Sequence, residues 1–146
     1  MRRALLIAVA AAALLLAAQS AARVLVKHRF EAPVQGGANN NAIELNSYFK
    51  KGVPKTVTDL QWQNLSCPSG GAILFRGVQK WTAQVDDKGT FNTTQPVKNA
   101  SGAKVKLTGT FGRKNGKATL KGTFQLKNLP ECPAGTGKLA YKGRQL

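Results

Sequence analysis

The stretch KVKLTGTFGRKNGKATLKGTFQLK, residues 104–127, decides how the rest of the chain is interpreted. Two runs within it alternate apolar and polar residues with a period of two, which is the pattern of a half-buried β-strand. Between the runs, Asn115 and Gly116 can both adopt the positive φ angles that a two-residue type I′ turn requires. The sequence therefore predicts a β-hairpin whose turn is centred on these two residues.

A turn at this point also fixes the register of the predicted hairpin. The expected cross-strand pairs are Lys114 with Lys117, Phe111 with Leu120, Leu107 with Phe124 and Val105 with Leu126. The large apolar residues in this register meet apolar partners, whereas a slip by one residue would move one strand's apolar set to the other face. The opposite face is expected to carry Lys104, Lys106, Thr108, Thr110, Lys121, Thr123, Gln125 and Lys127.

The same register places Gly109 opposite Gly122 on the apolar face of the hairpin. Two facing glycines leave a notch, and an aromatic ring can cover strand glycines of this kind. We expect the ring of Trp62, Trp81 or Tyr141 to fill the notch.

The chain begins with a pattern typical of a secretory signal peptide. Arg2 and Arg3 precede an unbroken apolar run over residues 4–18, and small residues follow it. The run is short of the roughly 20 residues that a membrane-spanning helix needs, which disfavours the alternative of a membrane anchor. We predict a signal peptide over residues 1–20, cleaved after Ser20 or Ala22, and a single β-domain over residues 21–146 that does not span the membrane once processed.

The charge of the chain is strongly positive and unevenly distributed. The sequence has 22 Lys and Arg against 6 Asp and Glu, and from Pro96 onward it has 11 basic residues and one acidic residue, Glu131. Such an excess favours contact with anionic polymers and surfaces and does not by itself decide among them.

Two cysteines in an exported chain most simply form one disulfide bond, here between Cys67 and Cys132. Each cysteine begins a similar tetrapeptide, CPSG or CPAG, and each tetrapeptide precedes a strand-like run. Closing so long a loop would stabilise the fold by roughly 4 kcal/mol in the chain-entropy model. Two free thiols, or a metal pair with His28 as the other soft ligand, remain as alternatives.

The remainder of the chain also has the pattern of short strands. We expect strands over residues 21–34, 41–50, 56–66, 72–85, 90–97 and 138–144, with a loop at 35–41, turns at 51–55 and 86–89, a bulge or bend near Asp59 and a bulge or break at Gly77. His28 falls on the apolar side of the first strand, where a partly buried structural imidazole is expected. No helical period follows the signal peptide. The fold class is therefore predicted as all-β, a single antiparallel β-sandwich or small β-barrel of about eight strands.

The order of these features resembles uncharacterised small secreted bacterial β-domains. The landmarks are Cys67, residues 86–91, the LTGTF and LKGTF runs at 107–111 and 120–124, the CPAG run at 132–135 and residues 139–141. The resemblance implies an exported bacterial domain with paired cysteines, and it implies no function.

The sequence contains few residues that could carry catalysis. One histidine and two cysteines expected to be oxidised make a nucleophilic triad improbable. Glu44 and Asp59 could face each other across a hairpin, as a carboxylate pair for a small hydrolase would require. Surface charges adopt such positions by default, so a non-catalytic domain without a cofactor or a metal is expected. Asp86 and Asp87 fit a hairpin turn better than a calcium loop, which needs more oxygen ligands.

The hairpin supplies the candidate binding surface. A basic face is predicted at Lys104, Lys106, Lys121 and Lys127, extended at the turn by Arg113, Lys114 and Lys117. It would neutralise the anionic groups of a cell-wall polymer, an anionic lipid surface or a nucleic acid, so its affinity should fall with salt. The face has no aromatic residue for base stacking, which disfavours nucleic acid. The alternatives are a structural module of the cell exterior and a solvated face that only protects the sheet from edge association.

Overall fold

The computed structural model describes residues 24–34, 42–63, 65–67, 72–73, 76–77 and 81–146. All the regular secondary structure of these residues is β-strand, which confirms the all-β fold class. In chain order the strands are β1 (Val26–Pro33), β2 (Ala42–Lys50), β3 (Val53–Gln63), β4 (Leu65–Ser66), β5 (Ala72–Ile73), β6 (Arg76–Gly77), β7 (Thr82–Gln84), β8 (Thr90–Pro96), β9 (Lys104–Lys114), β10 (Lys117–Lys127) and β11 (Leu139–Gln145). The predicted signal peptide at residues 1–20 and the predicted loop at residues 35–41 lie outside the described residues.

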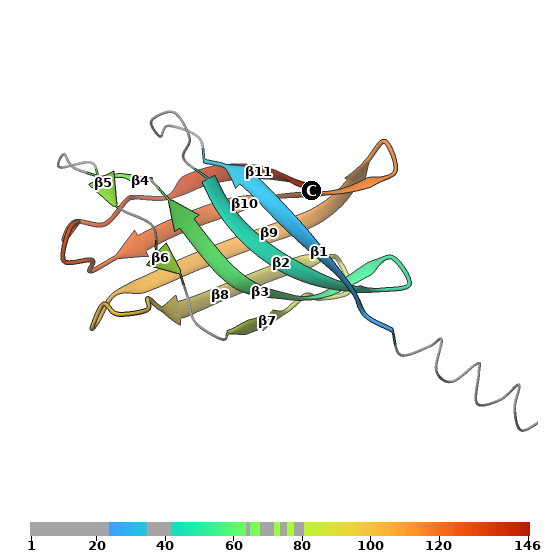
Figure 1. Cartoon of the computed structure of the whole chain (residues 1–146), viewed down its shortest axis with the longest axis horizontal. Helices are drawn as coiled ribbons and strands as arrows, with labels where there is room; N and C mark the ends of the chain where they lie inside the picture. The colour runs from blue at the N-terminus through green and yellow to red at the C-terminus, as the bar shows by residue number, and fades with distance from the viewer. Residues whose placement is uncertain (1–23, 35–41, 64, 68–71, 74–75, 78–80) are drawn as a thin grey trace, which may run out of the picture.

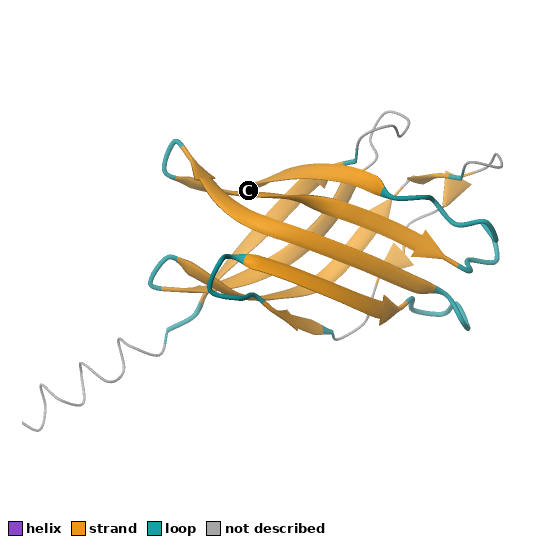
Figure 2. Cartoon of the chain, turned by 180° about the vertical axis from the view of Figure 1, so that it is seen from behind, coloured by secondary structure: helices purple, strands orange, loops and turns teal. Residues whose placement is uncertain are grey.

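One antiparallel sheet curls into a nearly closed barrel (Figure 1). Its strand order is β6-β3-β2-β1-β11-β10-β9-β8, and β7 also pairs with β3. Because β6 and β7 pair with different parts of β3, they share one position of the barrel, which therefore has eight positions. The Lys98 N–H donates to the Gly77 carbonyl oxygen at 3.2 Å, which links the chain after β8 to β6. Strands β1–β3 form one side and β8–β10 the other (Figure 2).

The hairpin predicted for residues 104–127 is present as β9 and β10, with the expected register throughout. Asn115 and Gly116 have φ angles of 52° and 76°, as a type I′ turn requires. The turn between β2 and β3 has the same form, with positive φ at Lys51 and Gly52 only. The turn predicted over residues 51–55 was therefore too long. Pro54 lies inside β3, at a register irregularity where a residue without an N–H is tolerated.

The segment over residues 72–85 differs most from the prediction. Its described residues form three short strands, whereas one bent strand or two shorter ones were expected. β5 pairs with β4 in a separate two-stranded sheet, so residues 72–73 do not belong to the barrel sheet. β6 ends at Gly77, where a bulge or break was expected, and residues 78–80 lie outside the described residues. The first strand is also shorter than predicted, because its pairing with β2 begins only at Val26.

The notch between Gly109 and Gly122 is filled by Tyr141, one of the three rings expected. Tyr141 lies directly opposite Gly122 in the sheet, and its hydroxyl group is 2.8 Å from where a Cβ atom would stand on either glycine. The hydroxyl group donates a hydrogen bond of 2.7 Å to the Thr108 carbonyl oxygen. The Phe91 ring also covers Gly109, a contact that the sequence analysis did not anticipate.

The disulfide bond predicted between Cys67 and Cys132 is formed, with the two Cα atoms 5.7 Å apart. It connects the residue after β4 with the loop that joins β10 to β11, and both cysteines are buried. Leu126 anchors that loop by donating its N–H to the Thr136 hydroxyl at 3.0 Å. The bond therefore fastens the small β4–β5 sheet to one end of the barrel.

Candidate functional site

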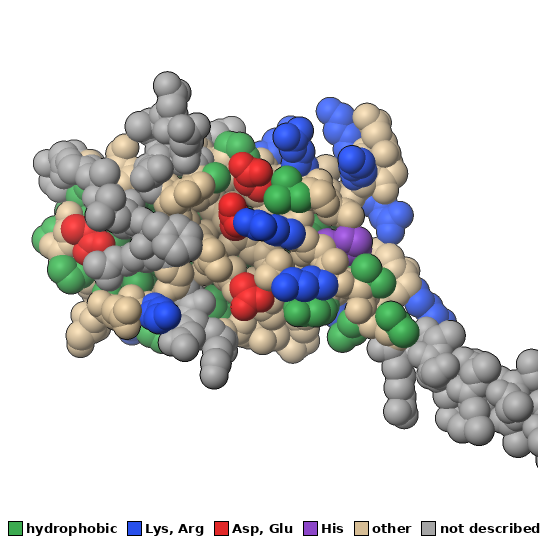
Figure 3. Space-filling view, in the orientation of Figure 1, with side chains coloured by type: hydrophobic (Ala, Val, Ile, Leu, Met, Phe, Trp, Pro, Cys, Tyr) green, Lys and Arg blue, Asp and Glu red, His purple; other side chains and the backbone are tan. Residues whose placement is uncertain are grey.

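The outer surface of the barrel differs in charge from one side to the other. On β1–β3, lysine and arginine side chains lie among carboxylates (Figure 3). Strands β8–β11 contain nine Lys and Arg and no Asp or Glu. The second surface, which is the candidate site, therefore has no carboxylate on its own strands. At its border, Glu31 of β1 stands opposite Arg144 of β11.

We use the name basic face for the outward, exposed lysine and arginine side chains of β9–β11. Six residues predicted from the sequence belong to it, namely Lys104, Lys106, Lys114, Lys117, Lys121 and Lys127. Arg113 does not belong to it, although the prediction included it. Its position in β9 has the parity of the inward-facing Phe111, and its Nη2 atom donates to the Gly52 carbonyl oxygen at 2.9 Å. Arg113 therefore binds the β2–β3 turn at the end of the barrel.

Two members of the basic face, Lys142 and Arg144, were missed by the sequence analysis. They lie on β11, which pairs with β10 so that Lys142 stands opposite Lys121 and Arg144 opposite Thr119. Alternation along β11 places both residues on its polar side, but no local signal identifies β10 as the neighbouring strand. The basic face consequently extends over three adjacent strands instead of two.

Three pairs of lysines stand directly opposite each other on this surface. The pairs are Lys104 with Lys127, Lys114 with Lys117, and Lys121 with Lys142. Like charges directly opposite each other in an antiparallel sheet are destabilising. The four strands β8–β11 supply no carboxylate that could offset this repulsion. A bound anionic group would relieve it, because each such pair could share one anion.

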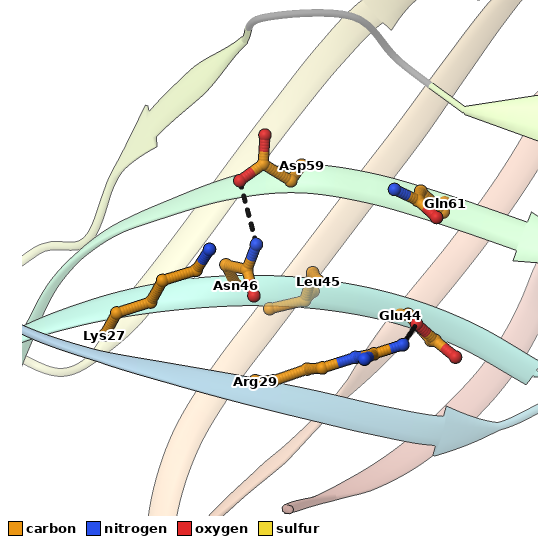
Figure 4. A pocket seen from close by; sticks show the side chains of 7 residues that line it. All are labelled: Lys27, Arg29, Glu44, Leu45, Asn46, Asp59 and Gln61. Atoms are coloured by element: carbon orange, nitrogen blue, oxygen red, sulfur yellow. Dashed lines mark hydrogen bonds and ion pairs between the residues drawn. The ribbon is translucent and has the colours of Figure 1, made fainter.

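A polar hollow of about 260 Å³ lies on the opposite side of the barrel (Figure 4). The bulge predicted near Asp59 forms part of it: the register of β2 and β3 shifts between Glu44 and Asn46, and Asp59 has a φ of 55°. The Asp59 carboxylate accepts hydrogen bonds of 2.8 Å from Asn46 Nδ2 and from the Thr58 hydroxyl. The residues that line the hollow are Lys27, Arg29, Glu44, Leu45, Asn46, Asp59 and Gln61.

This hollow contains the two carboxylates considered for hydrolysis. Glu44 forms an ion pair with Arg29. The hydrogen bond from Asn46 holds the pKa of Asp59 below its ordinary value, against the opposing effect of partial burial. Asp59 is therefore ionised at neutral pH. Within the hollow, both carboxylates have partners: Glu44 pairs with Arg29, and Asp59 accepts hydrogen bonds from Asn46 and Thr58.

The other two candidates from the sequence have structural contacts. His28 is half-buried, lies edge-on to Phe49 with ring centroids 4.9 Å apart, and has its Nδ1 atom 2.8 Å from Gln145 Nε2. Asp86 accepts hydrogen bonds from the N–H groups of Lys88 and Thr90 within the turn between β7 and β8. The hydrogen bond from the Thr90 hydroxyl group lowers the pKa of Asp86 most, and the one from the Thr90 N–H lowers it further. Asp86 thus closes a turn, as expected.

Comparison of the chain with protein-family models, curated proteins and solved structures found no match. The resemblance to secreted bacterial β-domains therefore stays a prediction. Within the described ranges, no three His, Cys, Asp or Glu side chains gather closely enough to hold a metal ion. In the same part of the chain, no helix is long and apolar enough to cross a membrane. The basic face is the surface from which a function can be argued.

Proposed function

We propose that this protein is an exported, non-catalytic binding module of the cell exterior that holds anionic polymers on its basic face. The observation that carries the proposal is the set of three directly opposed lysine pairs on strands that contain no carboxylate. Repulsion within these pairs costs stability in the free protein. An anionic ligand would offset this cost on binding.

The mechanism is neutralisation of closely spaced negative charges. Each lysine ammonium group is a compact charge on a flexible stem, so it can follow the spacing of a polymer without a fixed hydrogen-bonding geometry. Binding would release counterions and weaken steeply as salt is added. A cell-wall polymer or an anionic lipid surface fits this requirement, because the outward side chains of β8–β11 include no aromatic ring on which bases could stack.

The position of the basic face weakens the alternative that these lysines only prevent edge association. Lysines that block association are useful on edge strands, where backbone groups are unpaired. Strands β9 and β10 are interior strands with hydrogen-bonded neighbours on both sides, and β11 lies between β10 and β1. A protective role therefore does not account for charges concentrated on these three strands.

The proposal is tested by retention of the protein on immobilised heparin and on vesicles rich in phosphatidylglycerol, at low and at high salt. The test variant carries Lys104→Gln, Lys106→Gln, Lys121→Gln and Lys127→Gln. A control variant with the same change in net charge carries Lys27→Gln, Lys50→Gln, Lys51→Gln and Lys55→Gln, all in β1–β3 or the turn between β2 and β3.

We expect wild type and the control variant to be retained at low salt and released at high salt, and the test variant to elute much earlier. Equal retention of the test and control variants would refute a role for the basic face. Absence of retention of the wild-type protein on either support at low salt would refute anion binding itself.

A further inference from the structure

We infer that the basic face contains a discrete site for one tetrahedral oxyanion, a phosphate or sulfate ester group, in the hollow above Gly112. This inference rests on the proposed function and assigns it a binding position. The hollow has a volume of about 330 Å³ and lies beside the β9–β10 turn. It is lined by Thr110, Phe111, Gly112, Arg113, Lys114, Thr119, Leu120, Lys121 and Lys142.

The hollow exists because Gly112 interrupts the outward row of side chains along β9. Thr110 precedes it and Lys114 follows it on the same side of the strand. Across the sheet, Gly112 pairs with Thr119. A Cβ atom on Gly112 would have only the Thr119 hydroxyl oxygen within 4 Å, at 3.1 Å. The glycine thus leaves open space between Thr110 and Lys114.

Cations border this space on several sides. Lys121 and Lys142 stand opposite each other on β10 and β11, and Lys121 is also paired with Thr110 of β9. Lys114 borders the hollow from the end nearer the turn, where it faces Lys117. The hollow is therefore lined by both residues of one opposed lysine pair and by one residue of a second pair. Arg113 also lines it, but its Nη2 atom donates to Gly52.

The donors around the hollow indicate the class of anion. Three ammonium groups and the hydroxyl groups of Thr110 and Thr119 offer more donors than the two coplanar oxygens of a carboxylate can accept. A tetrahedral oxyanion presents its oxygens in several directions, and lysine binds phosphate as a point charge. The volume is at the lower end of the range for ligand pockets, about 300–1,000 Å³, and leaves room for the polyol or sugar that bears the ester.

The decisive variant is Gly112→Val, which fills the hollow without changing the charge. Gly112 does not have a positive φ angle, so a β-branched residue suits this strand position. Two charge variants accompany it: Lys121→Gln with Lys142→Gln at the hollow, and Lys104→Gln with Lys127→Gln at the other end of the same face. Thermal unfolding of each variant establishes that it is folded.

Affinity is measured at low salt for three probes that carry the anion on different supports: polyphosphate, dextran sulfate and phosphatidylglycerol vesicles. We expect Gly112→Val to lower affinity roughly tenfold for at least one probe. A decrease of this size corresponds to the loss of one or two charge-assisted hydrogen bonds. The Lys121 and Lys142 variant should lose more affinity for that probe than the Lys104 and Lys127 variant. The probe affected identifies whether the ester is a polymer phosphate, a sulfate or a lipid phosphodiester.

Wild-type affinity for all three probes in folded Gly112→Val, with equal losses in the two charge variants, would overturn the discrete site and leave the basic face intact. Failure of the wild-type protein to bind any probe would overturn both proposals. If Gly112→Val does not fold, Gly112→Ser is measured in its place, since its smaller side chain also enters the hollow. The affinities of Gly112→Ser for the three probes then decide between the same two outcomes for the discrete site.

Discussion

Single residues determine how closely β9, β10 and β11 approach one another. Tyr141 occupies the space that Gly109 and Gly122 leave, and its buried hydroxyl group is satisfied by the Thr108 carbonyl oxygen. Burial raises the pKa of Tyr141 far above its ordinary value, so this hydroxyl group remains a donor across the physiological range. The opposed glycines were visible in the sequence because the hairpin register is local. The identity of the ring depended on β11 pairing with β10, which is not a local property.

We predict that Gly122→Ala destabilises the protein strongly. The added Cβ atom would stand 1.9 Å from the Thr108 carbonyl oxygen, a backbone atom that cannot move without disturbing β9. A loss of about 3 kcal/mol in the free energy of unfolding is expected, at the upper end for overpacking. Gly112→Ala on the outer surface is the matched control and should cost much less. Equal losses in urea unfolding would contradict the close approach of Gly122 to the Thr108 carbonyl oxygen.

Because of Asp59, the free energy of unfolding should depend on pH in the acid range. Its pKa is held below the ordinary value of 3.8 chiefly by the hydrogen bond from Asn46. A carboxyl group with a lowered pKa in the folded state contributes stability above its unfolded pKa, and this contribution is lost as pH falls through the folded pKa. Stability should therefore decline below about pH 4.

The prediction is tested with Asn46→Ala, which removes the largest cause of the shift. The difference in unfolding free energy between pH 7 and pH 3 should be smaller in this variant than in wild type. Part of the difference should persist, because the pKa of Asp86 is also lowered in the folded state. An unchanged difference between the two pH values would show that the Asn46–Asp59 hydrogen bond does not contribute.

At the scale of elements, prediction succeeded where a turn fixes the register and failed where pairing is long-range. The β9–β10 hairpin follows from Asn115 and Gly116 because a two-residue turn leaves only one register for its strands. The alternation over residues 72–85 was ambiguous, since it does not specify which strand each part pairs with. In the structure, β5 joins β4 while β6 and β7 join β3 at separate places.

The candidate site shows the same division. Six lysines of the basic face follow from the hairpin alone, while Lys142 and Arg144 required the neighbouring strand to be known. The sequence alone could have excluded Arg113 from the basic face, because Arg113 has the same parity in β9 as the inward-facing Phe111. Its contact with Gly52 joins residues 61 positions apart and could not have been predicted.

The disulfide bond attaches the small β4–β5 sheet to the barrel, and few other contacts hold this sheet in place. We predict that replacing Cys67 and Cys132 together by alanine lowers the free energy of unfolding by roughly 4 kcal/mol, because the unfolded chain loses a long covalent loop. Reduction of the wild-type protein should produce a similar loss. Amide exchange should accelerate first in β4 and β5, which pair only with each other in the described structure. Two alkyl adducts on the unreduced native protein would show that the bond is absent.

At the scale of the whole molecule, barrel closure gives the protein two chemically distinct outer surfaces. The sequence left sandwich and barrel as alternatives, because closure depends on how β6, β7 and β8 meet across the last gap in the sheet. Once the barrel is formed, the mixed-charge strands β1–β3 lie on one side and β8–β10 on the other, and β11 connects β10 with β1 (Figures 1 and 2). The excess positive charge of the chain is thus concentrated on one outer surface, which composition alone could not establish.

The central claim is that anions bind to the basic face and not to the positively charged protein at large. The most direct test is a titration of the isotope-labelled protein with polyphosphate, followed by amide chemical shifts in NMR spectra. The largest shifts are predicted in β9, β10 and β11, with those at Gly112, Lys121 and Lys142 greatest. The outer residues of β1–β3 should change little. Shifts spread evenly over both sides of the barrel, or concentrated on β1–β3, would contradict the claim.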